Sequence, residues 1–90
     1  SVEKISELCL RYALRGLMSG NYEQGKRYFH LSHAFKVDQS KNEFANELKQ
    51  IFENLDNPDI SRKIARVSKK QGRMSRSVSY DPPEPYEKIH

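Results

Sequence analysis

The chain has 90 residues, of which 36% are hydrophobic and 31% are charged, and its formal net charge is +4. This length suits one small domain, and no apolar run approaches the ~20 residues that a membrane-spanning helix needs. The single cysteine, Cys9, excludes an intramolecular disulfide and a thiolate cluster for zinc, which favours a reducing, intracellular compartment, cytoplasmic or nuclear.

The positive charge is concentrated in one stretch. Residues 61–76 contain seven basic residues and no acidic one. In contrast, residues 1–60 carry a net charge of −1 and residues 77–90 a net charge of −2. A nearly neutral body followed by a cationic arm is typical of a protein that binds a partner.

Two helices joined by a tight turn are expected at the start of the chain. Apolar residues at three- and four-residue steps predict a first helix over residues 2–19. Gly20 can adopt the left-handed conformation that ends a helix, and Asn21 suits the cap of a second helix over residues 21–36. The faces expected to be buried consist of Val2, Ile5, Cys9, Tyr12, Ala13 and Leu17 on the first helix, and of Tyr22, Gly25, Phe29 and Ser32 on the second.

A third helix is expected over residues 40–56. Ser40 and Glu43 have the spacing of a capping box, in which each side chain satisfies a free backbone N–H of the first turn. The apolar seam of this helix, with polar residues on either side of it, consists of Phe44, Leu48, Ile51, Phe52 and Leu55.

A fourth helix is expected over residues 58–70, because Asn57 suits the N-cap and Pro58 the first helical position. Its apolar stripe is narrow, so this helix can dock on a neighbour but cannot fold alone. That stripe consists of Ile60, Ile64 and Val67. Gly72 is expected to end the helical pattern, and the serines and prolines beyond it predict an extended tail.

These elements predict an all-α fold, since no run of residues alternates in the manner of a strand. Residues 1–57 are expected to form a three-helix bundle, residues 58–72 a basic helix, and residues 73–90 a flexible tail rich in serine and proline. A bundle this short can leave an apolar face uncovered, which makes a homodimer an alternative way to bury it.

The stretch from Cys9 to Val37 resembles one tetratricopeptide repeat, a helix–turn–helix unit. Ala13 and Gly25 stand where the two helices of that repeat pack closest, and Phe29 stands at its aromatic position. Departures from the pattern are Cys9, Tyr12, Gly16 and Val37, where the repeat has Trp, Leu, Tyr and Pro. The Gly-Asn-Tyr-Glu turn is also similar to one in microtubule-interacting-and-trafficking domains. Both resemblances imply protein–protein recognition.

Catalytic and metal-binding chemistry are not expected. His30 and His33 have a chelating spacing, but no third ligand falls on the same helix face. Cys9 lies in an apolar stripe, which indicates a packing thiol rather than a nucleophile. Glu43 and Glu47 are typical of a solvated helix face rather than of a general acid and base. We therefore expect a protein that is not an enzyme and holds no cofactor or metal.

The sequence thus predicts a protein–protein interaction module, a helical adaptor domain with a basic arm. Because aromatic side chains dominate interface energies, the expected protein-binding residues are Tyr22, Tyr28, Phe35 and Phe44. The alternative is an accessory domain that binds RNA or DNA through residues 62–76, without strong sequence preference because this stretch has no aromatic residue to stack on bases. The basic residues that would contact phosphates are Arg62, Lys63, Arg66, Lys69, Lys70, Arg73 and Arg76.

Overall fold

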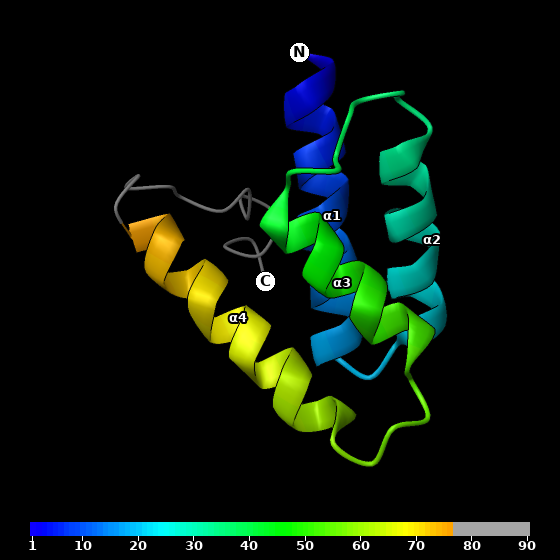
Figure 1. Ribbon diagram of the computed structural model, residues 1–90, viewed down its shortest axis with the longest axis vertical. Helices are drawn as coiled ribbons and strands as arrows, with labels where there is room; N and C mark the ends of the chain where they lie inside the picture. Colours follow the sequence, from blue (N-terminus) through cyan, green and yellow to red (C-terminus); the bar gives the residue numbers. More distant parts are fainter. Residues whose placement is uncertain (77–90) are drawn as a thin grey trace, which may run out of the picture.

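Four helices make up the described part of the chain, which comprises residues 1–76, with side chains described through residue 72 (Figure 1). In this computed structural model, α1 spans Val2–Met18, α2 spans Tyr22–His33, α3 spans Glu43–Glu53 and α4 spans Ile60–Arg76. No residue in this range belongs to a strand, so the prediction of an all-α fold is confirmed. None of these four helices is long and apolar enough to cross a membrane. Most of the expected tail, residues 77–90, lies outside the described residues.

The turn between α1 and α2 is the one that the sequence predicts. Gly20 has a φ of 82°, in the left-handed region that favours glycine. The Asn21 Oδ1 accepts a hydrogen bond from the backbone N–H of Gln24 at 3.2 Å. The two helices approach each other most closely where Gly16 faces Gly25, since a Cβ on Gly16 would lie 2.7 Å from the backbone nitrogen of Gly25. Two glycines therefore allow the backbones of the hairpin to touch.

The N-cap of α3 is Asn42, so the prediction of a capping box at Ser40 and Glu43 is wrong. The Asn42 Oδ1 accepts a hydrogen bond from the backbone N–H of Ala45 at 3.1 Å. Ser40 instead donates its backbone N–H to Asp38 Oδ1 at 3.0 Å, and this bond lowers the pKa of Asp38 below its ordinary value. Because Asp38 turns the chain at this point, the helix starts after the turn.

α4 begins later and ends later than predicted. The Asn57 Oδ1 accepts a hydrogen bond from the N–H of Asp59 at 2.8 Å, which closes a turn over Pro58 before the helix starts at Ile60. At the other end, residues 73–76 form the last turn of α4 instead of the start of the tail. Gly72 does not adopt the positive φ of a helix-ending glycine. A glycine inside a helix costs only about 1 kcal/mol relative to alanine, so the helix continues through it.

The core is shared by all four helices. Its fully buried apolar side chains include Leu10 of α1 and Leu48 of α3. The predicted stripe of α4 is confirmed, because Ile60, Ile64 and Val67 are buried in the same cluster. α4 therefore packs on α1 and α3 as part of one hydrophobic interior (Figure 1).

The buried face of α1 is rotated from the predicted one. Val2 and Ile5 are 48% and 46% exposed, so their prediction as core residues is wrong. Leu10 and Leu14 are buried in their place, because α1 packs against α3 and α4 as well as α2 and so buries a wider arc. The members of the predicted stripe that are buried are Cys9, Ala13 and Leu17.

Candidate functional site

One face of the α1–α2 hairpin carries exposed apolar side chains. Ile5, Leu8 and Leu31 are 46%, 36% and 46% exposed. Leu8 lies one helical turn from Tyr12, and Leu31 one turn from Tyr28. The rings of these two tyrosines pack together, with centroids 5.2 Å apart. Helical spacing therefore places the five side chains on one surface, which we call the hairpin face.

A hollow of about 310 Å³ opens beside the tyrosine pair. It is lined by residues of α1, α2 and the turn between them, including Tyr12, Gly16 and Tyr28. Both tyrosines are half-buried, so each ring is held against its surroundings and still reaches the surface. Gly16 adds no side chain to the hollow, which leaves room between the two rings and the turn.

Basic residues border the hairpin face. Lys4, Arg15 and Arg27 are exposed, and each lies one helical turn from a member of the hairpin face. Arg11 also lies at this border, where it forms an ion pair with Glu7 at 3.5 Å. Within α1 and α2, no acidic residue lies three or four positions from any of the five members. The border of the apolar surface therefore carries more basic than acidic residues, and its acidic residue Glu7 is paired with Arg11.

The four aromatic residues expected to bind a protein do not gather at one place. Tyr28 lies on the hairpin face. Tyr22 is half-buried and lines a hollow of about 470 Å³ between the end of α1 and α4. Phe35 is half-buried just after α2, and Phe44 is only 7% exposed within the core. Of these four, only Tyr28 is among the five side chains that define the hairpin face.

Sequence reasoning missed the three aliphatic members of the hairpin face. The sequence pattern predicts a core position for Ile5 and no binding surface at Leu8 or Leu31. The signal that could have found them is spacing, because Ile5, Leu8 and Tyr12 recur at three- and four-residue steps next to the buried stripe of α1. A second apolar stripe beside the core stripe indicates a helix with two covered faces.

α4 carries all seven basic residues that the sequence singles out and no acidic residue. Its exposed basic side chains are Arg62, Lys63, Arg66 and Lys69. Lys70 is partly buried. Arg73 and Arg76 lie in the last turn of the helix, and their side chains are outside the described part of the structure.

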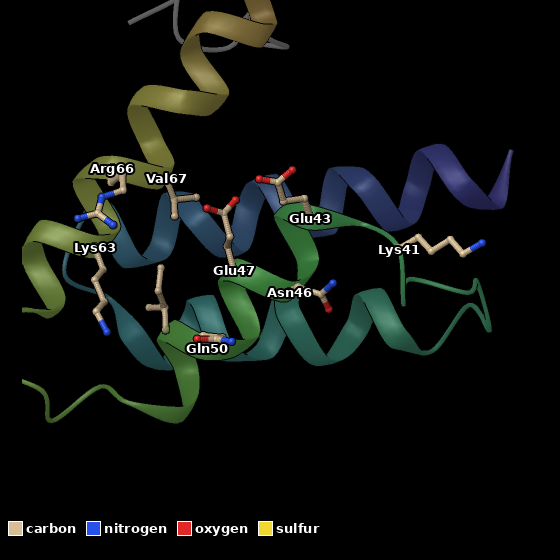
Figure 2. Close-up of a pocket in the computed structure, with 9 residues that line it drawn as sticks. Lys41, Glu43, Asn46, Glu47, Gln50, Lys63, Arg66 and Val67 are labelled. Atoms are coloured by element: carbon tan, nitrogen blue, oxygen red, sulfur yellow. The ribbon is translucent and has the colours of Figure 1, made fainter.

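Charges of opposite sign face each other between α3 and α4. A hollow of about 520 Å³ separates these helices, and Figure 2 shows its lining. Lys63 and Arg66 line it from α4, whereas Glu43 and Glu47 line it from α3. A polyanion that approached α4 from this side would meet the two carboxylates, so this side favours nucleic acid less than the opposite flank of α4 does.

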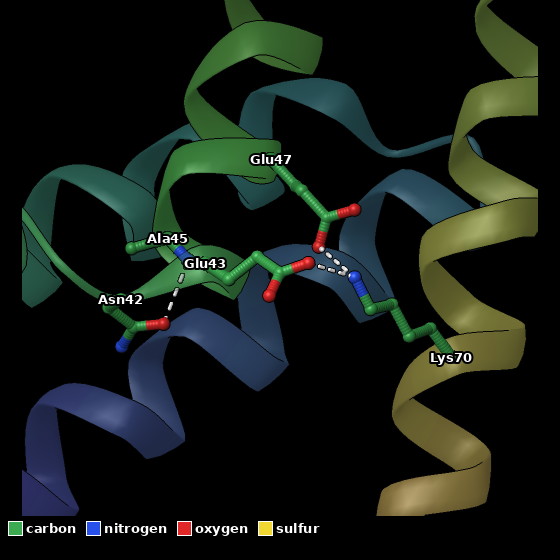
Figure 3. Close-up of polar contacts among 5 residues, drawn as sticks. All are labelled: Asn42, Glu43, Ala45, Glu47 and Lys70. Atoms are coloured by element: carbon green, nitrogen blue, oxygen red, sulfur yellow. Dashed lines mark hydrogen bonds and ion pairs between the residues drawn. The ribbon is translucent and has the colours of Figure 1, made fainter.

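Lys70 is paired within the protein (Figure 3). Its Nζ donates a hydrogen bond to Glu43 Oε1 and lies 3.7 Å from Glu47 Oε1. The hydrogen bond to Glu43, together with the charges of Glu47 and Glu43, raises the pKa of Lys70 above its ordinary value. Lys70 is thus positively charged, but the carboxylates of Glu43 and Glu47 on α3 compensate its charge. It therefore adds less than its neighbour Lys69 to the positive potential on the outer side of α4.

The histidines and the cysteine have packing contacts. His33 Nδ1 lies 2.9 Å from the carbonyl oxygen of Phe29, and the two rings meet edge to face with centroids 4.8 Å apart. Cys9 is 6% exposed, and burial raises the pKa of its thiol. Among the residues with described side chains, no group of three or more His, Cys, Asp or Glu could hold a metal ion.

No protein-family model, curated protein or solved structure matches this chain. The resemblances to the tetratricopeptide repeat and to microtubule-interacting-and-trafficking domains therefore stay expectations from the sequence. The hairpin face and the exposed side of α4 are the two candidate binding surfaces.

Proposed function

We propose that the protein is a non-enzymatic interaction module that binds an amphipathic segment of a protein partner on its hairpin face. The observation that carries this proposal is the exposure of Ile5, Leu8 and Leu31 beside a half-buried tyrosine pair. Exposure of clustered apolar side chains to water is unfavourable, so such clusters mark sites where another molecule docks.

The tyrosine pair supports this proposal because it is a preformed anchor. Tyr12 and Tyr28 hold each other through ring contact, so little side-chain entropy remains to be lost when a partner binds. The hollow beside them can accept one side chain of the partner. The aliphatic residues then cover the rest of an apolar stripe on that partner.

The basic residues that border the hairpin face determine which kind of partner fits it. Lys4, Arg15 and Arg27 favour a segment whose apolar stripe is flanked by acidic residues. In a symmetric dimer formed through this face, the same patch of both copies would meet, and like charges would be brought together. The occupant that fits is thus an acidic amphipathic helix of another protein rather than a second copy.

A synthetic helix tests the proposal. The probe is a fluorescein-labelled peptide with leucines at positions i, i+3, i+4 and i+7 and glutamates on both flanks, followed by fluorescence anisotropy. The double variant Ile5→Ser/Leu31→Ser is expected to weaken its binding at least about tenfold, because two contact residues lose their apolar side chains. The same variant should unfold at nearly the wild-type denaturant concentration, since both side chains are half-exposed.

Met18→Ser is the matched control, because Met18 is 57% exposed and lies outside the hairpin face. It should change peptide affinity less than about twofold. The proposal fails if Met18→Ser weakens binding as much as the double variant, or if wild-type protein does not bind the peptide at about 1 mM. Sedimentation gives a further check: a dimer that Ile5→Ser/Leu31→Ser dissociates would assign the face to a second copy.

A further inference from the structure

We propose that α4 also binds the phosphate backbone of a nucleic acid, through one flank formed by Arg62, Arg66 and Lys69. These residues are exposed and lie four and three positions apart, so they follow one side of the helix. Along the helix axis they span about 10 Å, which is enough to meet successive phosphates of one strand. We call them the outward flank.

The outward flank is held in a fixed orientation by the core. Ile60, Ile64 and Val67 on the opposite side of α4 are 7%, 6% and 4% exposed. Because these side chains fix which side of the helix faces the protein, the arginines and the lysine project on a preformed scaffold. A preformed array loses less conformational entropy on binding than the same cations on a disordered arm.

The carboxylates of α3 determine which basic residues of α4 can contact phosphates. Lys70 is compensated by Glu43 and Glu47, and Lys63 lines the hollow that these carboxylates also line. Arg66 lines this hollow as well, so it lies at the edge of the outward flank, whereas Arg62 and Lys69 do not line it. A phosphate near that side of α4 would be repelled by the glutamates. The backbone of a nucleic acid is therefore expected to run along the outward flank, away from α3.

The same geometry favours nucleic acid over an anionic membrane. Over residues 60–72, where the side chains of α4 are described, its large apolar residues Ile60, Ile64 and Val67 are already packed in the core, which leaves none of them on this flank to insert between lipids. α4 also has no aromatic residue to stack on bases. The expected binding is thus electrostatic, steeply dependent on salt and nearly independent of base sequence.

Two adjacent lysines provide the sharpest test. Binding of a fluorescein-labelled 20-residue oligouridine is followed by anisotropy at about 50 mM salt, where the loss of one contact to a single strand lowers affinity about fivefold to tenfold. Lys69→Gln is expected to show this loss, as is Arg62→Gln, whereas Arg66→Gln should show a smaller loss because Arg66 also lines the hollow with Glu43 and Glu47. Lys70→Gln removes the same formal charge from the next position and should lower affinity by less than about twofold.

A salt titration and a second variant complete the test. Three phosphate contacts predict a slope of about −2 in a plot of log affinity against log salt for a single strand. Glu47→Gln is expected to raise affinity for oligouridine, because it removes a repelling carboxylate and loosens the hold on Lys70. Melting curves confirm that each variant is folded.

Three results would overturn this inference. The first is no binding of wild-type protein to oligouridine at about 50 mM salt. The second is an equal loss of affinity in Lys69→Gln and Lys70→Gln, since charge number alone would then explain the binding. The third is tighter binding to phosphatidylserine vesicles than to oligouridine, with the same ranking of variants. Ile5→Ser/Leu31→Ser should leave oligouridine affinity unchanged, so this test stands independently of the hairpin face.

Discussion

The contact between Gly16 and Gly25 sets how closely α1 and α2 pack. A Cβ on Gly16 would lie 2.7 Å from the nitrogen of Gly25 and 3.0 Å from the carbonyl oxygen of Asn21. Both are backbone atoms, which cannot rotate out of the way. We expect Gly16→Ala to push the helices apart and lower the free energy of unfolding, measured by urea denaturation, by about 1–3 kcal/mol.

Gly72→Ala is the control for that experiment. A Cβ on Gly72 meets nothing within 4 Å, and the residue lies inside α4 just as Gly16 lies inside α1. Alanine is the better helix former by up to about 1 kcal/mol, so this variant should be at least as stable as wild type. Equal stabilities of Gly16→Ala and Gly72→Ala would refute the close approach of α1 and α2.

The start of α3 depends on Asn42 rather than on Ser40. Figure 3 shows the hydrogen bond from the Ala45 N–H to the Asn42 side chain. Removing a cap of this kind costs about 1 kcal/mol, so Asn42→Ala should lower the midpoint of urea unfolding measurably. Ser40→Ala removes no bond to the first turn of α3 and should stay within about 0.5 kcal/mol of wild type. The reverse order of the two variants would restore the capping box predicted from the sequence.

At the scale of helices, the sequence predicts features that a few neighbouring residues determine. The turn at Gly20 and Asn21 results from one left-handed glycine and one side-chain cap, both local effects. The buried stripe of α4 arises in the same way, because Ile60, Ile64 and Val67 are the large apolar residues available near its start. Interactions among neighbouring residues are therefore sufficient to predict both this turn and this stripe.

Features that depend on distant parts of the chain are not predictable in this way. Ile5 has the apolar character and spacing of a core residue, but the positions of α3 and α4 decide which arc of α1 is covered. Two further differences arise locally, where neighbouring residues allow more than one outcome. Gly72 can end a helix or continue one, and here it does not adopt a positive φ. Ser40 and Asn42 can both cap a helix, and the turn made by Asp38 selects between them.

The same limit applies to the candidate surfaces. Seven basic residues on α4 are visible in the sequence, but the pairing of Lys70 with Glu43 joins positions 27 residues apart. The hairpin face likewise needs the contact between Tyr12 and Tyr28, which brings two helices together. Sequence spacing identifies the stripes, and tertiary packing determines which of them stay exposed.

Across the whole molecule, α4 combines two roles on opposite sides. Its apolar side completes the core shared with α1 and α3, and its other side carries exposed cations. The hairpin face belongs to different helices, so the two proposed binding surfaces can be occupied together. A partner segment and a nucleic acid would then be held by one small scaffold.

Two isoleucines test whether α4 is part of that scaffold. Ile64 of α4 is 6% exposed, whereas Ile5 of α1 is 46% exposed. Ile64→Ala should lower the free energy of unfolding by about 2–4 kcal/mol, because it leaves a cavity in the shared core. Ile5→Ala makes the same chemical change on the surface and should cost less than about 0.5 kcal/mol. Similar small losses in both variants, by urea denaturation, would mean that α4 adds nothing to the core.

Native-state hydrogen exchange of the α4 amides tests the central claim most directly, because both roles of this helix require it to be docked. The amides of Ile64 and Val67 are expected to exchange as slowly as that of Leu48 in α3, through the same global unfolding, since all three side chains share one core. Exchange of the α4 amides near the rate of an unstructured chain, with Leu48 still protected, would contradict the account.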